Sequence, residues 1–130
     1  MLQLVSVLAF LSGLTIIEIN KGDHPRFTSV HGVTGLVTYI TIALQSLGGV
    51  VQYFLPAQVL GSVERGKRVY KYHRVLGYVL LVLELATIVA ATQTTFNVNL
   101  LKIPFLPVVG ASVLLLVGVA SRISRRKLGL

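Results

Sequence analysis

Four runs of mostly apolar residues, at about 2–19, 27–55, 72–92 and 105–121, constrain the fold of this chain more than any other feature. A helix of about 20 apolar residues crosses the roughly 30 Å hydrocarbon core of a bilayer. The mean hydropathy of +0.81 and a charged fraction of only 12% exclude an ordinary water-soluble domain of 130 residues. The runs therefore predict an all-α integral membrane protein, a four-span helical bundle forming a single domain over residues 1–130.

The basic residues lie in short polar segments between these runs, and their distribution predicts the topology of the chain. Four spans place the N-terminus, the second connection and the C-terminal tail on one side of the membrane. That side carries nine lysines and arginines: Arg65, Lys67, Arg68, Lys71, Arg74, Arg122, Arg125, Arg126 and Lys127. The other side carries three: Lys21, Arg26 and Lys102. We therefore expect a multi-pass protein with both termini in the cytosol. The net charge of +8 is assigned to topology and contact with the lipid bilayer, not to nucleic acid.

Two histidines stand near the starts of the second and third runs in similar surroundings. His31 is followed four residues later by Gly35, and His73 by Gly77. On a helix, residues four apart lie on the same face, so one turn after each imidazole a glycine leaves that face without a side chain. Such a pair can seat a planar cofactor such as haem, with the histidine as an axial ligand. The alternative is that the histidines are ordinary residues near helix starts and that the glycines serve close helix packing.

The cysteine and methionine content limits which haem such a site can hold. The chain has no cysteine, which excludes covalent c-type haem and iron–sulfur ligation, and its one methionine is Met1. A haem would therefore be b-type and would depend on His31 and His73. In the predicted topology these histidines lie near opposite membrane faces, about 20–25 Å apart. They cannot ligate one iron, so each is predicted to be half of a separate site. Two such centres would carry electrons across the bilayer.

At this point the sequence resembles the cytochrome b561 family, the ascorbate-linked transmembrane electron carriers. The second run begins with the pattern F-x-S-x-H-G, formed by Phe27, Ser29, His31 and Gly32. The other matching residues are Leu44, Gln45, Gly48, Gly49, Pro56, Arg68, Lys71, Tyr72, His73 and Gly77. The resemblance implies that the four runs are similar to the last four helices of a six-helix core that binds two b-type haems. It also implies that His31 and His73 are axial ligands of the haem irons.

The resemblance further implies an activity, an ascorbate-dependent transmembrane oxidoreductase. Electrons would pass from cytosolic ascorbate through an inner and then an outer haem b to monodehydroascorbate or ferric iron. Arg68 and Lys71 are expected to attract ascorbate at the inner face, the alternative being that they anchor the chain to lipid phosphates. His24, in the first connection, is a candidate contact for the outer acceptor. A homodimer is compatible with this interpretation.

The chain departs from the family because the partner histidines of both sites are missing. In the family, the partner of His31 lies on the second helix. The partner of His73 lies near the start of the third helix, where this chain has Met1 and Gln3. We therefore expect each haem site to be half-formed and the sequence to be an N-terminally truncated form of a longer protein, inactive by itself. Two alternatives stay open: a non-catalytic structural or assembly subunit without haem, and a site completed by histidines from another chain.

Overall fold

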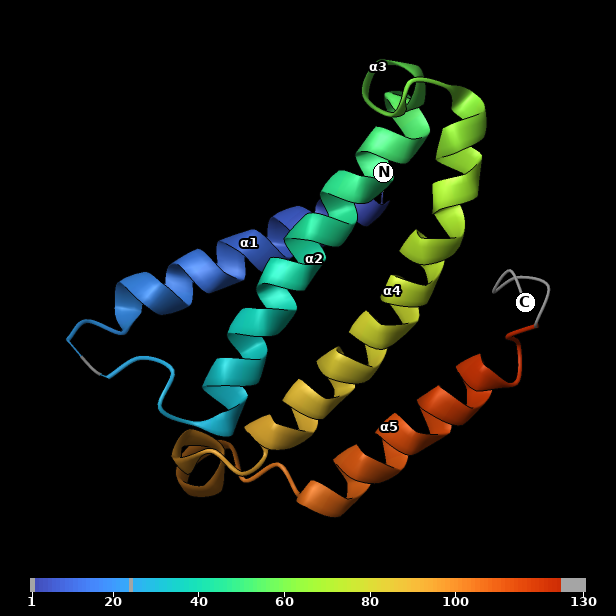
Figure 1. The fold of residues 1–130 in the computed structure, drawn as a ribbon. Helices are drawn as coiled ribbons and strands as arrows, with labels where there is room; N and C mark the ends of the chain where they lie inside the picture. Colours follow the sequence, from blue (N-terminus) through green and yellow to red (C-terminus); the bar gives the residue numbers. More distant parts are fainter. Residues whose placement is uncertain (1, 24, 125–130) are drawn as a thin grey trace.

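The computed structural model describes residues 2–23 and 25–124 (Figure 1). Met1, His24 and the tail residues 125–130 lie outside the described part, and with them the predictions made for His24 and for the last three basic residues. The described elements are α1 (Leu2–Asn20), α2 (Val30–Phe54), α3 (Pro56–Leu60), α4 (Val63–Ala91), the π-helical turn η1 (Asn97–Leu101) and α5 (Phe105–Ala120). The predicted all-α class is confirmed, since the regular structure of the described residues is entirely helical.

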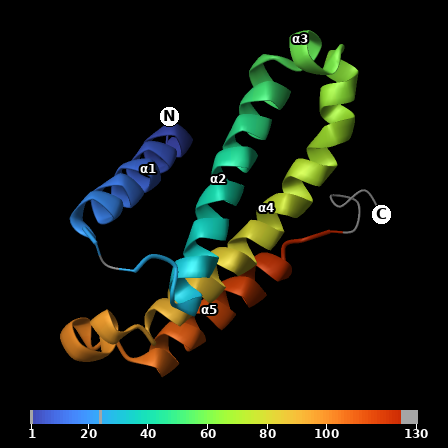
Figure 2. The ribbon, with the colours of Figure 1, turned by 60° about the vertical axis from the view of Figure 1, so that its left-hand side comes forward.

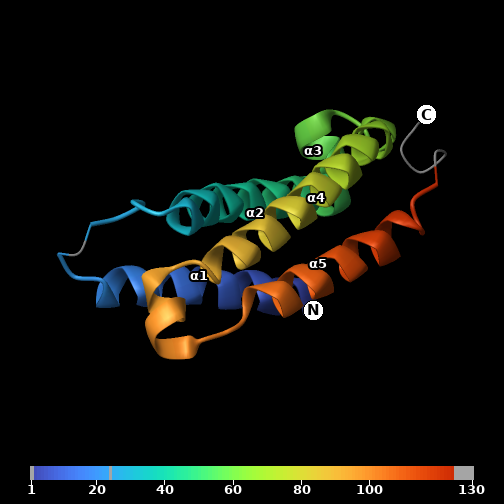
Figure 3. The ribbon, with the colours of Figure 1, turned by 90° about the horizontal axis from the view of Figure 1, so that it is seen from below.

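The long helices α2 and α4 form the central pair of the structure. They lie antiparallel and side by side, with the most extensive contact between any two elements (Figures 1 and 2). Helix α1 packs on α2, and α5 packs on α4. Viewed from below, α1 and α5 lie on the same side of the central pair (Figure 3). The connections before α2 and after α4 lie at one end of the pair, and α3 lies at the other (Figure 1).

Two of the four predicted spans are long and apolar enough to cross a membrane, namely α2 with 25 residues and α4 with 29. At 1.5 Å per residue, α2 is about 37 Å long, which exceeds the hydrocarbon thickness. The described parts of α1 and α5 are shorter apolar helices, and the 16 residues of α5 extend only about 24 Å. A membrane crossing by α1 and α5 therefore stays a prediction.

The distribution of buried residues is the reverse of that in a soluble protein. Among the described residues, Leu80 is the one large apolar side chain that is buried. The buried polar residues are Thr38, Thr87, Thr92, Asn97 and Ser112, whereas large apolar side chains are exposed along all the long helices. A surface so rich in apolar side chains is stable only against lipid or other apolar partners. The polar side chains lie inside, where other residues satisfy them.

The start of α2 shows what the residues of the F-x-S-x-H-G pattern do. Phe27 has a left-handed backbone (φ 56°), so the predicted run enters the helix only at Val30. Ser29 is the N-cap, and its hydroxyl accepts a hydrogen bond of 3.0 Å from the backbone N–H of Gly32. A Cβ on Gly32 would lie 3.3 Å from the Cα of Phe27. The pattern therefore forms a tight turn and cap that fix where the helix, and with it His31, begins.

The basic segment before the third run is mostly helical, whereas the sequence predicted a loop with helix only from about Tyr72. Gly61 ends α3 in the left-handed conformation that favours glycine (φ 82°). Ser62 then caps α4 by accepting a hydrogen bond of 3.1 Å from the N–H of Arg65. Helix α4 therefore starts at Val63, nine residues before Tyr72. This adds about 13 Å of basic helix to the apolar part.

A buried asparagine organises the connection between α4 and α5. Asn97 is 5% exposed. Its amide nitrogen donates to the backbone oxygens of Thr92 (2.8 Å) and Ile103 (3.0 Å), and its amide oxygen accepts from the N–H of Ile103 (3.2 Å). These bonds tie the end of α4 to the residues just before α5 across the π-helical turn. Asn97 thereby sets the point from which α5 returns along α4.

Replacement of Asn97 by alanine should destabilise this end of the molecule. The change leaves two carbonyls and one N–H without their partner, and each loss at a buried group costs about 1–3 kcal/mol. We expect a clearly lower midpoint of thermal unfolding, measured by circular dichroism in detergent. Asn99→Ala is the matched control, because Asn99 is exposed in the same turn. Equal midpoints for the two variants would contradict this role of Asn97.

Candidate functional site

His31 lies in the first turn of α2 and is held by the other central helix. Its Nδ1 lies 3.0 Å from the backbone oxygen of Thr87 on α4. A carbonyl oxygen only accepts hydrogen bonds, so Nδ1 carries the proton and donates it to this bond. In the neutral imidazole the lone pair is then on Nε2, the nitrogen that remains for a metal. A hydrogen bond of this kind fixes the orientation of a ligating histidine.

The contact between α2 and α4 at this level depends on small and polar side chains. The hydroxyls of Thr38 and Thr87 lie 3.2 Å apart, and both residues are buried. A Cβ on Gly35 would lie 3.8 Å from the γ-methyl of Thr87, so the bare face of this glycine is turned toward α4. These contacts set the register that brings the Thr87 carbonyl to His31. Whether Gly35 also makes room for a haem stays a prediction.

His73, on α4, lies against a pair of glycines on α2. A Cβ on Gly49 would lie 3.3 Å from Cε1 and 3.7 Å from Nε2 of the His73 ring, and one on Gly48 would lie 3.8 Å from Nδ1. The imidazole therefore packs closely on Gly49, where a Cβ would require the ring to shift. On its other side the ring of Tyr70 stacks on His73, with 6.0 Å between ring centroids and 26° between ring planes. Packing thus fixes the orientation of this imidazole.

Gln45 connects the two helices at the same level. Its Nε2 donates a hydrogen bond of 2.6 Å to the backbone oxygen of His73. The amide passes over Gly77, where a Cβ would lie 3.2 Å from the same nitrogen. The sequence predicts space for a planar ring at Gly77 beside His73, and in the structure the Gln45 amide occupies at least part of that space. A role of Gly77 toward haem stays a prediction.

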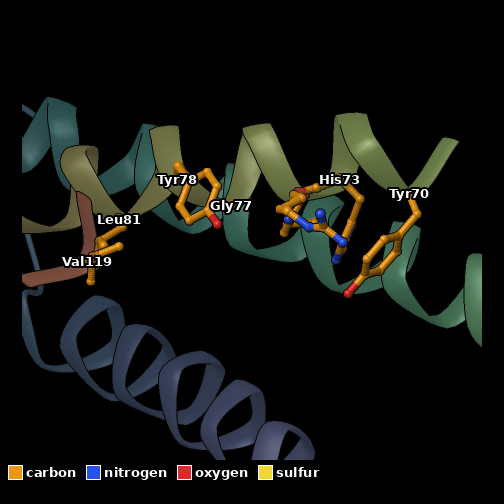
Figure 4. A pocket seen from close by; sticks show the side chains of 8 residues that line it. Tyr70, His73, Gly77, Tyr78, Leu81 and Val119 are labelled. Atoms are coloured by element: carbon orange, nitrogen blue, oxygen red, sulfur yellow. The ribbon is translucent and has the colours of Figure 1, made fainter. Parts of the chain in front are cut away.

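A groove of about 460 Å³ opens beside His73 (Figure 4). Tyr70, His73, Gly77 and Tyr78 line it from α4, and Val119 reaches it from α5 (Figure 4). The remaining lining residues are Gln45, Arg74 and Leu81. The volume is in the range of small-molecule sites in proteins. The groove combines an imidazole, phenol groups and one cation with apolar walls, a composition suited to a largely apolar ring that carries a few polar groups.

The two histidines lie at opposite ends of the central pair. His31 is bonded at the level of Thr87, which follows His73 by 14 residues in α4. At 1.5 Å per residue this is about 21 Å along the helix axis. One iron cannot bind both histidines. Within the described residues no cluster of three or more histidine, cysteine, aspartate or glutamate side chains forms a metal site.

Arg68 and Lys71, the described residues predicted to meet ascorbate, lie on a different face of α4 from His73. Arg68 and Lys71 are exposed on α4 and line neither described cavity, and the Nζ of Lys71 lies 5.0 Å from the ring centroid of Tyr72. Their role toward ascorbate stays a prediction. His24 lies outside the described residues. Beside it in sequence, Arg26 forms an ion pair of 2.7 Å with Glu18.

Comparison with known families shows to which family this chain belongs. The family model described as eukaryotic cytochrome b561 matches residues 1–97, about three quarters of the chain. The chain belongs to the cytochrome b561 family. Members are associated with membranes and bind haem b, and membership suggests transmembrane electron transfer. Searches of curated proteins and of solved structures found no match.

Within this family site, the structure adds residues that sequence reasoning did not assign. Thr87 holds His31 through a backbone carbonyl, and no sequence pattern predicts such a contact because it depends on the register between two helices. Tyr70, rather than the neighbouring Tyr72, stacks on His73. Its position three residues before His73, and so on nearly the same face of α4, is the signal that could have found it.

A large side chain at Gly49, in the glycine pair of α2, should displace the His73 ring. Gly49→Leu places a side chain where the imidazole lies, so the ring has to rotate out toward the groove. We expect faster modification of His73 by diethyl pyrocarbonate, measured by peptide mass spectrometry. Gly110→Leu is the matched control, because a Cβ at Gly110 meets no atom within 4 Å. An unchanged rate in Gly49→Leu would show that the glycine does not hold the ring.

Proposed function

We propose that this chain contributes to transmembrane electron transfer by supplying one axial ligand to each of two b-type haem sites, His31 at one and His73 at the other. Family membership supports the class of activity. The observation that carries the assignment is the hydrogen bond of 3.0 Å from His31 Nδ1 to the Thr87 carbonyl. It selects the tautomer in which Nε2 is available to iron, as in most ligating histidines.

The residues around His73 fit a haem in a different way. The Gly48–Gly49 pair removes bulk beside the ring, and the groove beside His73 provides about 460 Å³. Arg74 lines that groove, and a guanidinium there suits the carboxylates of a haem. We assign the imidazole to the iron and Arg74 to the carboxylates.

A b-type haem supplies one-electron redox chemistry when it is bound, and the chain determines its orientation, its access to water and its surroundings. The Nδ1–H of His31 donates to the backbone oxygen of Thr87, so the ring stays oriented. Gln45 holds the His73 backbone, which fixes the base of that side chain. Apolar helices α2 and α4 separate the two levels by about 21 Å and exclude water between them.

The second axial ligand of each iron has to come from outside the described residues. One source is a helix that precedes this sequence in a longer protein. Another is a histidine from a second chain, including a second copy of this one. A non-catalytic structural or assembly subunit without haem is the competing function, because the helices pack on each other without any cofactor.

We propose ascorbate as the electron donor at the cytosolic end and monodehydroascorbate or ferric iron as the acceptor at the other. What supports the donor is the concentration of positive charge on the first turns of α4, where Arg68 and Lys71 are exposed. Such charge attracts an anionic reductant in a manner that weakens with salt. His24 is the proposed contact for the acceptor.

Haem binding tests this function directly. The chain is purified in detergent with added haemin, and a dithionite-reduced minus oxidised visible spectrum is recorded. We expect a haem absorption band that falls by about half in His31→Ala and by about half in His73→Ala, because each histidine serves its own site. An upstream-extended form should give a larger band because it supplies the second ligands.

Loss of both halves of the band in either single variant would contradict two independent sites. His31→Ala and His73→Ala spectra identical to that of the unsubstituted chain would contradict the ligand assignment. If both the chain and its extended form stay blank, the structural-subunit function replaces this proposal. The double variant His31→Ala/His73→Ala is the control for haemin bound non-specifically in detergent.

A further inference from the structure

A second cavity lies at the corner where α2, α3 and α4 meet, at the end of the central pair far from His31. It has a volume of about 340 Å³. Polar groups in its wall come from Gln52, Lys67 and Tyr70, and the more apolar part comes from Tyr53, Pro56 and Val63. The backbones of Gly49 and Gly66 complete it. The wall of the cavity is therefore mostly apolar and includes a few polar groups.

The Gln52 side chain, which lines this cavity, has an unsatisfied hydrogen-bond acceptor. Its Oε1 is buried and makes no hydrogen bond to any of the described residues. A buried amide oxygen without a donor costs about 1–3 kcal/mol. A hydroxyl group satisfies such an amide well, because it donates to the oxygen and also accepts from the nitrogen. The cavity thus favours a ligand that carries hydroxyl groups.

The ammonium group of Lys67 favours a ligand with a negative charge. Its side chain lines the cavity, and no acidic residue belongs to the wall that the structure describes. An ammonium group is a strong point-charge partner for phosphate. A ligand that satisfies both Lys67 and Gln52 therefore carries a negative charge next to hydroxyl groups.

The position of the cavity at the membrane surface indicates where this ligand comes from. Gln52 lies two residues before the end of the membrane-spanning helix α2, and Lys67 lies in the basic first turns of α4. These turns extend about 13 Å beyond the apolar part of the helix, where the headgroups of a bilayer lie. Clusters of lysine and arginine at this level attract anionic lipids.

We propose that the corner cavity binds the headgroup of an anionic, hydroxyl-bearing lipid such as phosphatidylinositol. Its phosphate lies at Lys67, and a ring hydroxyl donates to Gln52 Oε1 once rotation of that side chain brings this buried oxygen to the cavity. The apolar wall of Tyr53, Pro56 and Val63 lies beside the glycerol and the upper acyl chains. This site is separate from the general attraction of basic residues to anionic lipids, because Gln52 carries no charge.

Binding in this cavity is linked to the His73 site through one side chain. Tyr70 lines both the corner cavity and the groove beside His73. Its ring stacks on His73, and the guanidinium carbon of Arg74 lies 4.9 Å from the centroid of the same ring. A headgroup that contacts Tyr70 therefore limits the positions open to the His73 imidazole.

Short-chain lipids test the proposal on the purified chain without haem. Thermal unfolding midpoints are measured in a neutral detergent while short-chain phosphatidylinositol or phosphatidic acid is titrated in, since a ligand of the folded state raises the midpoint. We expect phosphatidylinositol to bind about tenfold more tightly than phosphatidic acid. Such a ratio corresponds to one hydrogen bond to a buried group, about 1.4 kcal/mol.

Three substitutions separate the site from bulk electrostatics. Gln52→Leu keeps the charge and should abolish the preference for phosphatidylinositol while phosphatidic acid still binds. Lys67→Gln should weaken both lipids about tenfold. Arg65→Gln is the matched control: it removes one charge at the same end of the molecule, but Arg65 does not line the cavity. It should leave the ratio between the two lipids unchanged.

Two results would overturn the proposal. One is equal binding of the two lipids by the unsubstituted chain, with no effect of Gln52→Leu. The other is that ascorbate in neutral detergent raises the midpoint in a manner that depends on Gln52 and Lys67, while neither lipid does. The cavity would then be a site for a soluble anionic polyol. Neither result bears on the assignment of His31 and His73 as haem ligands, so failure of this proposal is distinguishable from failure of that one.

Discussion

The close contact between α2 and α4 is the interaction on which the rest of the structure depends. Between helices surrounded by lipid there is no hydrophobic driving force, so close approach and hydrogen bonds have to hold them together. The facing side of α2 accordingly carries Gly35, Thr38, Gln45 and Gly49, spaced three, seven and four residues apart. Each of these residues contacts a specific group on α4. The apolar side chains point outward instead, which explains why so few of them are buried.

This one interface holds both histidines, but by different means. His31 is oriented by a directional bond to a carbonyl on the opposite helix. His73 is oriented by contact, between the glycine pair of α2 and the ring of Tyr70. A shift of α2 along α4 by one turn, about 5.4 Å, would break the hydrogen bond between His31 and Thr87. It would also move the glycine pair away from the ring of His73. The register of the pair therefore determines both candidate ligands together.

The sequence predicts most of the features that depend on local pattern, with the start of α4 as the exception, and none of the contacts that depend on helix register. The apolar run at 105–121 corresponds to α5 within one residue, because Pro104 and the loss of hydropathy mark its ends. The start of α4 was placed too late because basic residues suggested a loop, although Gly61 and Ser62 are a helix stop and a cap. The partnership of His31 with Thr87 was beyond reach, since the two residues are 56 positions apart and share no pattern.

The helical start of α4 also changes how charge can serve the inner site. Because residues 63–71 are helical, each basic side chain has a fixed direction. At 100° per residue, Arg68 and Lys71 point about 140° and 160° away from His73 around the helix. They can gather anions near the membrane, but an anion held by them is on the far face of α4. Arg74 and Tyr70, which form a cation–π pair, lie on the side of α4 between Lys71 and His73. Tyr70 is the uncharged member of this cation–π pair, so a change of its side chain would alter the surroundings of His73 without removing a positive charge from α4.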